Sequence, residues 1–160
     1  MTEAALPRRV AILGPASSGK TTLAAGLAQR YGTVWVPEYL REFVGEEERV
    51  PVAGDQFHIA STQRRREDAA AEGANAYLFC DTAPLMTAIY SRHYFGGIDD
   101  RLARLADGHQ RDYALTLVTA PDIVCVGVRR PRAAVGAGGA HIGRDHVTGF
   151  TPQADRGVAD

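Results

Sequence analysis

Short apolar runs alternate with longer amphipathic stretches along residues 8–118 of the sequence. Each apolar run spans a few residues and is rich in leucine, β-branched or aromatic side chains, which is typical of buried strands. We predict strands at Arg8–Gly14, Thr33–Val36, Ala76–Asp81 and Tyr113–Val118. Pro37 follows the second run and ends it, because proline cannot donate to a strand ladder.

The stretches between these runs carry helical patterns. From Lys20 to Arg30, apolar residues recur at the spacing of one helix face, and Gly32 follows as a stop signal. Further helices are predicted at Gln56–Ala76, Leu85–Tyr94 and Asp99–Asp107. Asp55 is a candidate N-cap, and the arginines at 64–66 are expected on a solvated face. Strands that alternate with helices predict an α/β layered fold with a mostly parallel sheet.

Composition narrows the class of protein. The chain has 160 residues, 45% apolar and 23% charged, which suits one globular domain with a sizeable core. Its net charge of −1 gives no electrostatic reason to expect nucleic acid or an anionic membrane as a partner. Cys80 and Cys125 lack metal or disulfide spacing, which favours a reducing, cytoplasmic compartment. The sequence does not indicate an oligomeric state.

The stretch Gly14–Thr21 matches the phosphate-binding pattern G-x4-G-K-T between a predicted strand and a predicted helix. Glycines allow backbone N–H groups to approach phosphate oxygens, and the helix N-terminus attracts the anion. Lys20 is the only lysine of the sequence, and a compact ammonium can follow the β- and γ-phosphates where an arginine fork cannot. Thr21 can ligate Mg²⁺. The residues expected to hold ATP are Gly14, Pro15, Ala16, Ser17, Ser18, Gly19, Lys20, Thr21 and Thr22.

Two carboxylates follow predicted strands and are expected beside this loop. Glu38 comes just after the second strand, and Asp81 ends the third. The carboxyl ends of parallel strands meet at one edge of a sheet, where ligands bind. Glu38 could orient or deprotonate a substrate hydroxyl, and Asp81 could hold Mg²⁺. The alternative for each carboxylate is to cap the helix that follows it.

Five blocks, in this order and spacing, resemble the nicotinamide-riboside kinase domain of NadR-type proteins. The resemblance covers about residues 10–126, most of the chain, and the blocks read "GPASSGKTTLAAGLA", "TVWVPEYLREF", "IASTQ", "CDTAPLMTAIYSRHYFG" and "DYALTLVTAPDI". The resemblance implies a three-layer P-loop NTPase fold and a kinase that transfers the γ-phosphoryl group of ATP, with Mg²⁺, to the ribose 5′-hydroxyl of nicotinamide riboside. The product would be nicotinamide mononucleotide, an intermediate of NAD salvage.

The resemblance also implies roles for individual residues. Glu38 and Asp81 would face the ribose and the metal, and either could be the base. Arg41 would be a polar contact near the substrate. Tyr94 is a candidate for stacking on the nicotinamide ring, with a core position at the helix end as the alternative. Trp35 is a second aromatic candidate, although packing in the core is the favoured interpretation.

The sequence departs from the family pattern after Val126. Residues 127–160 are rich in Gly, Ala and Arg and have no period, so we expect a kinase domain at 1–126 and a divergent tail. Cys125 stands where the family has tryptophan, and no Asp-Gly-x-Arg segment follows. Either the tail has diverged or the reading frame has shifted near codon 126. We favour the frameshift. Arg129, Arg130 and Arg132 lie near the place of the family's lid arginine, but their spacing assigns the role to none of them.

Three functions therefore remain open from the sequence. The leading one is a nicotinamide-riboside kinase. The second is a P-loop kinase for another nucleoside or a small alcohol. The third is a non-catalytic ATP-binding module.

Overall fold

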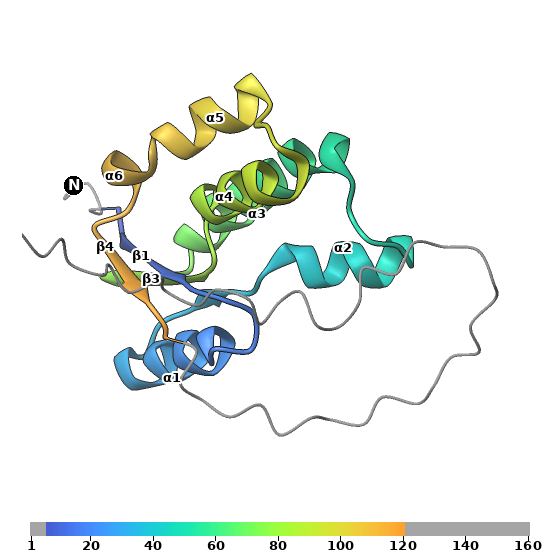
Figure 1. The fold of residues 1–160 in the computed structure, drawn as a ribbon. Helices are drawn as coiled ribbons and strands as arrows, with labels where there is room; N and C mark the ends of the chain where they lie inside the picture. The colour runs from blue at the N-terminus through green and yellow to red at the C-terminus, as the bar shows by residue number, and fades with distance from the viewer. Residues whose placement is uncertain (1–5, 121–160) are drawn as a thin grey trace, which may run out of the picture. The chain divides into compact units, whose positions relative to one another are not determined.

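The computed structural model describes residues 6–120, which form a parallel sheet between layers of helices (Figure 1). The strands are β1 Arg8–Leu13, β2 Trp35–Val36, β3 Tyr77–Asp81 and β4 Leu115–Val118. The helices are α1 Lys20–Tyr31, α2 Tyr39–Glu47, the 3₁₀ turn η1 Ala53–Asp55, α3 Gln56–Ala71, α4 Pro84–Phe95, α5 Asp100–Asp107 and α6 His109–Asp112. These elements confirm the predicted α/β fold.

The sheet order is β2-β3-β1-β4, and all three pairings are parallel. In register, Ile12 of β1 lies opposite Asp81 of β3, and Leu13 lies opposite Val118 of β4. The loops that follow these strands therefore leave the sheet at the same edge. That edge carries the residues from which the candidate site is built.

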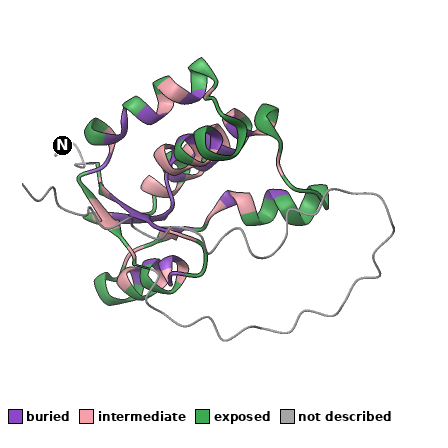
Figure 2. Ribbon diagram, viewed as in Figure 1, coloured by how far each residue is buried: buried purple, intermediate pink, exposed green. Residues whose placement is uncertain are grey.

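Side chains alternate between the two faces of the central strands, as the period of a strand requires. Val10 and Phe79 pack with Ala28 of α1 on one face. Ala11, Leu13, Leu78 and Cys80 form a second cluster with residues from α3 and α4 on the other face. Figure 2 shows the burial concentrated on β1, β3 and the inward faces of the helices. The middle layer is thus apolar on both sides, as expected for a covered parallel sheet.

Helix α3 ends earlier than the sequence predicts, at Ala71 rather than at residue 76. Alanine favours a helix in the segment beyond, but the turn there is held by Asn75. The Asn75 amide Nδ2 donates to the carbonyls of Tyr31 and Gly32, 2.9 and 3.1 Å away. This tie to the end of α1 redirects the chain into β3.

Helix α2 is absent from the sequence-based prediction. Tyr39 and Phe43, one helical turn apart, pack against Ile59 of α3, with Leu40 beside them. Tertiary packing of this apolar pair stabilises a helix whose other positions are largely charged.

Two details at helix α3 correct the sequence-based interpretation. Asp55 precedes α3 but does not cap it, because its carboxylate accepts from the Val52 N–H and pairs with Arg49. Arg64 and Arg66 are not simply solvated, since Arg64 binds Asp112 and Arg66 binds Glu42. Arg65 is exposed, as predicted.

The expectations for residues 127–160, including the three candidate lid arginines, and for Cys125 lie outside the described residues. Among the helices that the structure describes, none is long and apolar enough to cross a bilayer.

Candidate active site

The phosphate-binding loop connects β1 to α1 and begins at Gly14. Gly14 has φ +148°, and a Cβ atom there would lie 2.2 Å from Thr119 Oγ1 and 2.8 Å from the Thr119 carbonyl. Thr119 is held in place by its own N–H, which donates to the Leu13 carbonyl at 2.8 Å. Glycine is therefore required at this position for steric reasons as well as for its φ angle.

The remainder of the loop is held by bonds to one carbonyl. Ser18 Oγ donates to the Pro15 carbonyl at 2.7 Å and lies 2.5 Å from Thr119 Oγ1. Lys20 Nζ also donates to the Pro15 carbonyl, at 2.8 Å. Gly19, with φ 83°, starts helix α1 without a side-chain cap, so no cap side chain occupies the first N–H groups of the helix. This arrangement suits the binding of phosphate oxygens.

Lys20 is buried and lies near two carboxylates. Burial lowers the pKa of its ammonium below the usual value, and the negative charges of Glu38 and Asp81 act in the opposite direction. The structure thus brings together the three residues that the sequence analysis names as catalytic candidates.

Asp81 ends β3 and is 1% exposed. Its Oδ2 accepts a hydrogen bond from Thr21 Oγ1 at 2.5 Å. Its Oδ1 is buried without a hydrogen-bond partner among the described residues. A buried carboxylate oxygen without a donor is costly unless a ligand satisfies it, and Mg²⁺ prefers oxygen ligands of this kind. Asp81 and Thr21 therefore fit the metal that accompanies a bound nucleoside triphosphate.

Residues 6–120 contain no cluster of three or more His, Cys, Asp or Glu side chains that could hold a metal. A magnesium site of this type does not need one, because Mg²⁺ binds through one or two protein oxygens, substrate phosphates and water.

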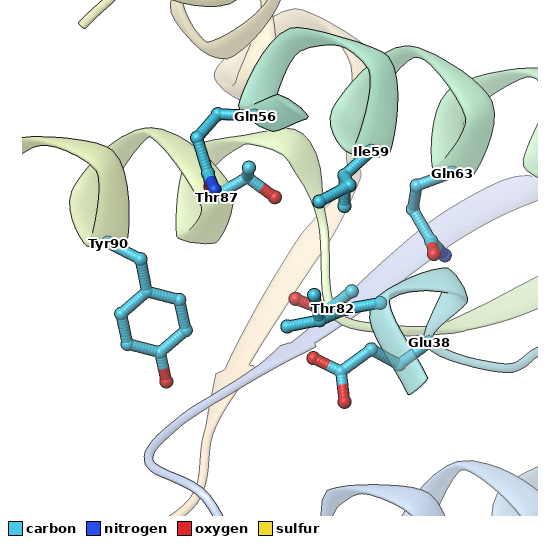
Figure 3. Close-up of a pocket in the computed structure, with 8 residues that line it drawn as sticks. Glu38, Gln56, Ile59, Gln63, Thr82, Thr87 and Tyr90 are labelled. Atoms are coloured by element: carbon cyan, nitrogen blue, oxygen red, sulfur yellow. The ribbon is translucent and has the colours of Figure 1, made fainter. Parts of the chain in front are cut away.

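Glu38 lies at a pocket that is also lined by Thr82, the residue after Asp81 (Figure 3). Its carboxylate accepts from Arg41 Nε at 3.1 Å, and the Arg41 side chain is otherwise exposed. The pocket combines hydroxyl, amide and apolar groups around this one carboxylate, and Glu38 is the only charged residue in its lining. The lining residues are Glu38, Leu40, Gln56, Ile59, Gln63, Thr82, Thr87 and Tyr90.

Tyr90 faces the same space as Glu38 in Figure 3. Burial, followed by the negative charge of Glu38, raises the pKa of the Tyr90 hydroxyl to about 12. The phenol therefore stays protonated at neutral pH and can donate a hydrogen bond inside the pocket.

The two aromatic candidates from the sequence do not line this pocket. Tyr94 is 47% exposed and packs its ring against Tyr90, 5.9 Å between centroids, so it is not a core residue. Trp35 packs with the Val10, Ala28 and Phe79 cluster on the α1 face, which is the core role that the sequence analysis favoured. Arg41 forms an ion pair with Glu38 at 3.1 Å, and its role as a polar contact near the substrate stays a prediction.

Sequence reasoning missed several lining residues, among them Tyr90, Thr82 and Gln56. Tyr90 precedes Tyr94 by one helical turn in the block "YSRHYFG", and this spacing was the available signal for it. Nothing in the sequence pattern marks Gln56.

Comparison with known proteins identifies the family. A family model described as an AAA domain matches residues 9–138. The chain belongs to this family. Its described part has the P-loop NTPase fold, which binds nucleotides.

The curated relatives share the NadR name. The chain is 32% identical over 126 residues to the trifunctional NAD biosynthesis/regulator protein NadR of Salmonella typhimurium, and equally to that of Escherichia coli. These matches cover 76% of this chain and 31% of each relative, so the chain spans about a third of their length. The matches confirm the resemblance to NadR-type proteins.

Solved structures agree on the fold. A NadR protein in complex with NR superposes with a TM-score of 0.59 at 22% identity, covering 71% of this chain and 34% of that one. A NadR protein in complex with NAD and AMP-PNP gives 0.57 at the same identity and coverage.

Proposed function

We propose that this domain is an ATP-dependent kinase that phosphorylates the ribose 5′-hydroxyl of nicotinamide riboside and yields nicotinamide mononucleotide. The observation that carries the proposal is the junction at the end of β3. Asp81 contacts Thr21 of the phosphate-binding loop, while the next residue, Thr82, lines a pocket that contains Glu38. The proposed donor and acceptor sites are therefore connected by two consecutive residues, Asp81 and Thr82.

The surroundings of the two carboxylates support different roles in the proposed reaction. Asp81 is buried against Thr21 and would hold Mg²⁺, whereas Glu38 lines the pocket and would serve as the base. Glu38 accepts the proton of the ribose hydroxyl, and the oxygen forms a bond to the γ-phosphorus of ATP. The bond from that phosphorus to the β–γ bridging oxygen breaks, and ADP leaves with the electron pair. Mg²⁺, when bound, neutralises charge on the phosphate oxygens.

Lys20 and the N-terminus of α1 contribute positive charge to the donor side. The ammonium now donates to the Pro15 carbonyl, and a phosphate oxygen is a stronger acceptor for the same group.

The identity of the acceptor rests on the resemblance and on the pocket. The relatives are named for NAD biosynthesis, and one solved relative holds NR. Nicotinamide riboside has a ribose and a positively charged ring, and a pocket with hydroxyls, amides and one carboxylate is compatible with both. The isolated cysteines favour a cytoplasmic site of action.

A coupled assay of ADP formation tests the proposal. The chain is given MgATP with nicotinamide riboside and, in parallel, with adenosine, uridine, cytidine and glycerol. We expect turnover with nicotinamide riboside well above the others. Turnover with another nucleoside alone would support the second function, and stabilisation by MgATP without turnover on any acceptor would support a binding module.

A further inference from the structure

Thr82 has an unusual backbone conformation for its residue type. Its φ is 80°, in the left-handed region where β-branched residues are genuine outliers. The conformation is fixed on the strand side, because the Thr82 N–H donates to the Ile12 carbonyl at 3.0 Å. The residue is 7% exposed and thus packed on most of its surface. A β-branched residue held in such a conformation is frequently part of a functional site.

This turn separates the two halves of the site. Asp81 directs its carboxylate to Thr21 of the phosphate-binding loop. One residue later, Thr82 lines the pocket that holds Glu38 (Figure 3). Helix α4 starts at Pro84, so the direction of Thr82 is fixed on both sides. Its hydroxyl makes no hydrogen bond to another described residue, although it can donate one bond and accept two.

The turn alone does not account for threonine. Glycine adopts a positive φ without steric cost, and asparagine adopts it more readily than threonine does. A residue that provided only the turn would therefore be expected to be one of these. Threonine adds a hydroxyl at the boundary between the phosphate-binding loop and the acceptor pocket.

We propose that Thr82 is an acceptor-binding residue whose hydroxyl hydrogen-bonds a hydroxyl of the bound nucleoside and holds it toward Glu38 and the γ-phosphate. This proposal rests on the proposed function and adds a residue to it. The ligand class is a neutral or cationic molecule with a sugar hydroxyl, because the lining of this pocket carries a carboxylate and no basic side chain.

Three variants of the full chain test the proposal. Thr82→Val keeps the β-branched shape and removes the hydroxyl, and Thr82→Ser keeps the hydroxyl. Thr62→Val is the matched control, because the Thr62 hydroxyl accepts from exposed Arg65 on α3, outside the pocket. For each we would measure kcat/KM for nicotinamide riboside, the calorimetric Kd of the acceptor with Mg-AMP-PNP present, and thermal stabilisation by MgATP.

We expect Thr82→Val to lower kcat/KM for the acceptor by roughly 10- to 100-fold, the loss typical of one hydrogen bond to a substrate, and to weaken acceptor binding. Stabilisation by MgATP should be unchanged. Thr82→Ser should retain activity within about 3-fold of the wild type, and so should Thr62→Val.

Each contrary outcome has a defined meaning. Wild-type acceptor kinetics in Thr82→Val would overturn the role of Thr82 and leave the proposed function intact. An equal loss in Thr82→Ser and Thr82→Val would show that the methyl group matters and not the hydroxyl, which also overturns it. If Thr82→Val does not fold, kcat/KM for the acceptor is compared between Thr82→Ser and Thr82→Asn, because asparagine tolerates the turn but places no hydroxyl there. Equal values in these two variants would overturn the role of the hydroxyl. A wild type that neither binds nor phosphorylates any tested acceptor would overturn both proposals.

Discussion

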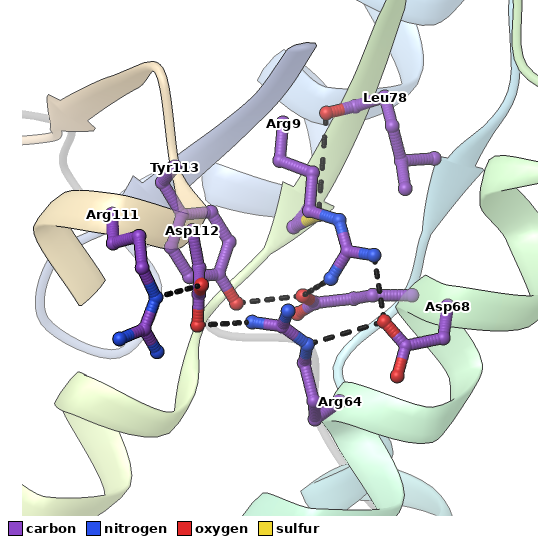
Figure 4. A network of polar contacts seen from close by, with 9 residues as sticks. Arg9, Arg64, Asp68, Leu78, Arg111, Asp112 and Tyr113 are labelled. Atoms are coloured by element: carbon purple, nitrogen blue, oxygen red, sulfur yellow. Dashed lines mark hydrogen bonds and ion pairs between the residues drawn. The ribbon is translucent and has the colours of Figure 1, made fainter. Parts of the chain in front are cut away.

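A buried glutamate on the sheet side of α3 should make the stability of this domain depend on pH in an unusual direction. Glu67 belongs to the buried face of α3 and is 0% exposed. Figure 4 shows the polar network around this position, in which Arg64 and Asp68 of α3 meet Arg9 of β1 and Asp112 at the end of α6. Its Oε2 accepts from the Tyr113 hydroxyl at 2.6 Å and lies 3.7 Å from an Arg9 nitrogen. Its Oε1 is buried without a hydrogen-bond partner among residues 6–120.

Burial raises the pKa of Glu67 from 4.5 to about 7, although Tyr113, Arg9 and Arg64 act against the shift. In the unfolded chain the Glu67 carboxyl ionises near its usual pKa of 4.5. Between pH 4.5 and about 7 the folded state therefore binds more protons than the unfolded state does. The free energy of unfolding must then fall as the pH rises through this window. At about 1.4 kcal/mol per pKa unit, the loss amounts to about 3 kcal/mol.

Glu67→Gln removes the titration and keeps an acceptor for Tyr113. We expect the variant to gain about 3 kcal/mol relative to the wild type between pH 4.5 and pH 8, measured by urea unfolding followed by circular dichroism. Burial lowers the pKa of His109, so the contribution of His109 to the free energy of unfolding rises with pH, opposite to that of Glu67. His109 is present in both proteins, so its contribution cancels in the difference between them. Glu72→Gln, at an exposed site just after α3, is the matched control and should show no such gain. A difference between Glu67→Gln and wild type that stays constant with pH would refute the reasoning.

Three further predictions concern the site. Gly14→Ala should destabilise the domain by about 2–4 kcal/mol in urea unfolding, because the new Cβ would meet Thr119, and an unchanged midpoint would contradict the loop geometry. Lys20→Ala should abolish thermal stabilisation by MgATP. Lys20→Arg should not restore it, because the planar guanidinium of arginine cannot take the place of a compact ammonium. Stabilisation of Lys20→Ala equal to that of the wild type would count against Lys20 as a phosphate-binding residue. Glu38→Gln should lower kcat by about 10²- to 10⁴-fold while MgATP still stabilises the variant, and a loss confined to KM would argue against a base at this position.

The parts of this molecule that the sequence predicts are those with a local physical cause. The strands β1, β3 and β4 follow from short apolar runs, and α1 follows from its apolar period and its glycine stop. The convergence of Lys20, Glu38 and Asp81 follows from parallel topology, since strand ends share an edge.

What the sequence does not predict depends on tertiary contacts. The buried face of α3 includes Gln63 and Glu67, so polar side chains occupy positions where a periodic pattern would show apolar ones. Tyr90 and Tyr94 have the same chemistry at positions one turn apart, and only the packing of α4 decides that Tyr90 lines the pocket. Aromatic character therefore predicts that this helix meets the site, but not which ring does so.

The phosphate-binding loop itself has a long-range component that its motif does not contain. Gly14 is sterically fixed by Thr119, and Ser18 contacts the same hydroxyl across 101 positions of sequence. Thr119 in turn is held to Leu13 as β4 pairs with β1. The loop conformation thus depends on correct docking of β4 against β1, so a substitution that weakens this pairing should impair nucleotide binding without touching the motif. The motif provides residues that allow the phosphate-binding conformation of the loop, and the pairing of β4 with β1 stabilises that conformation.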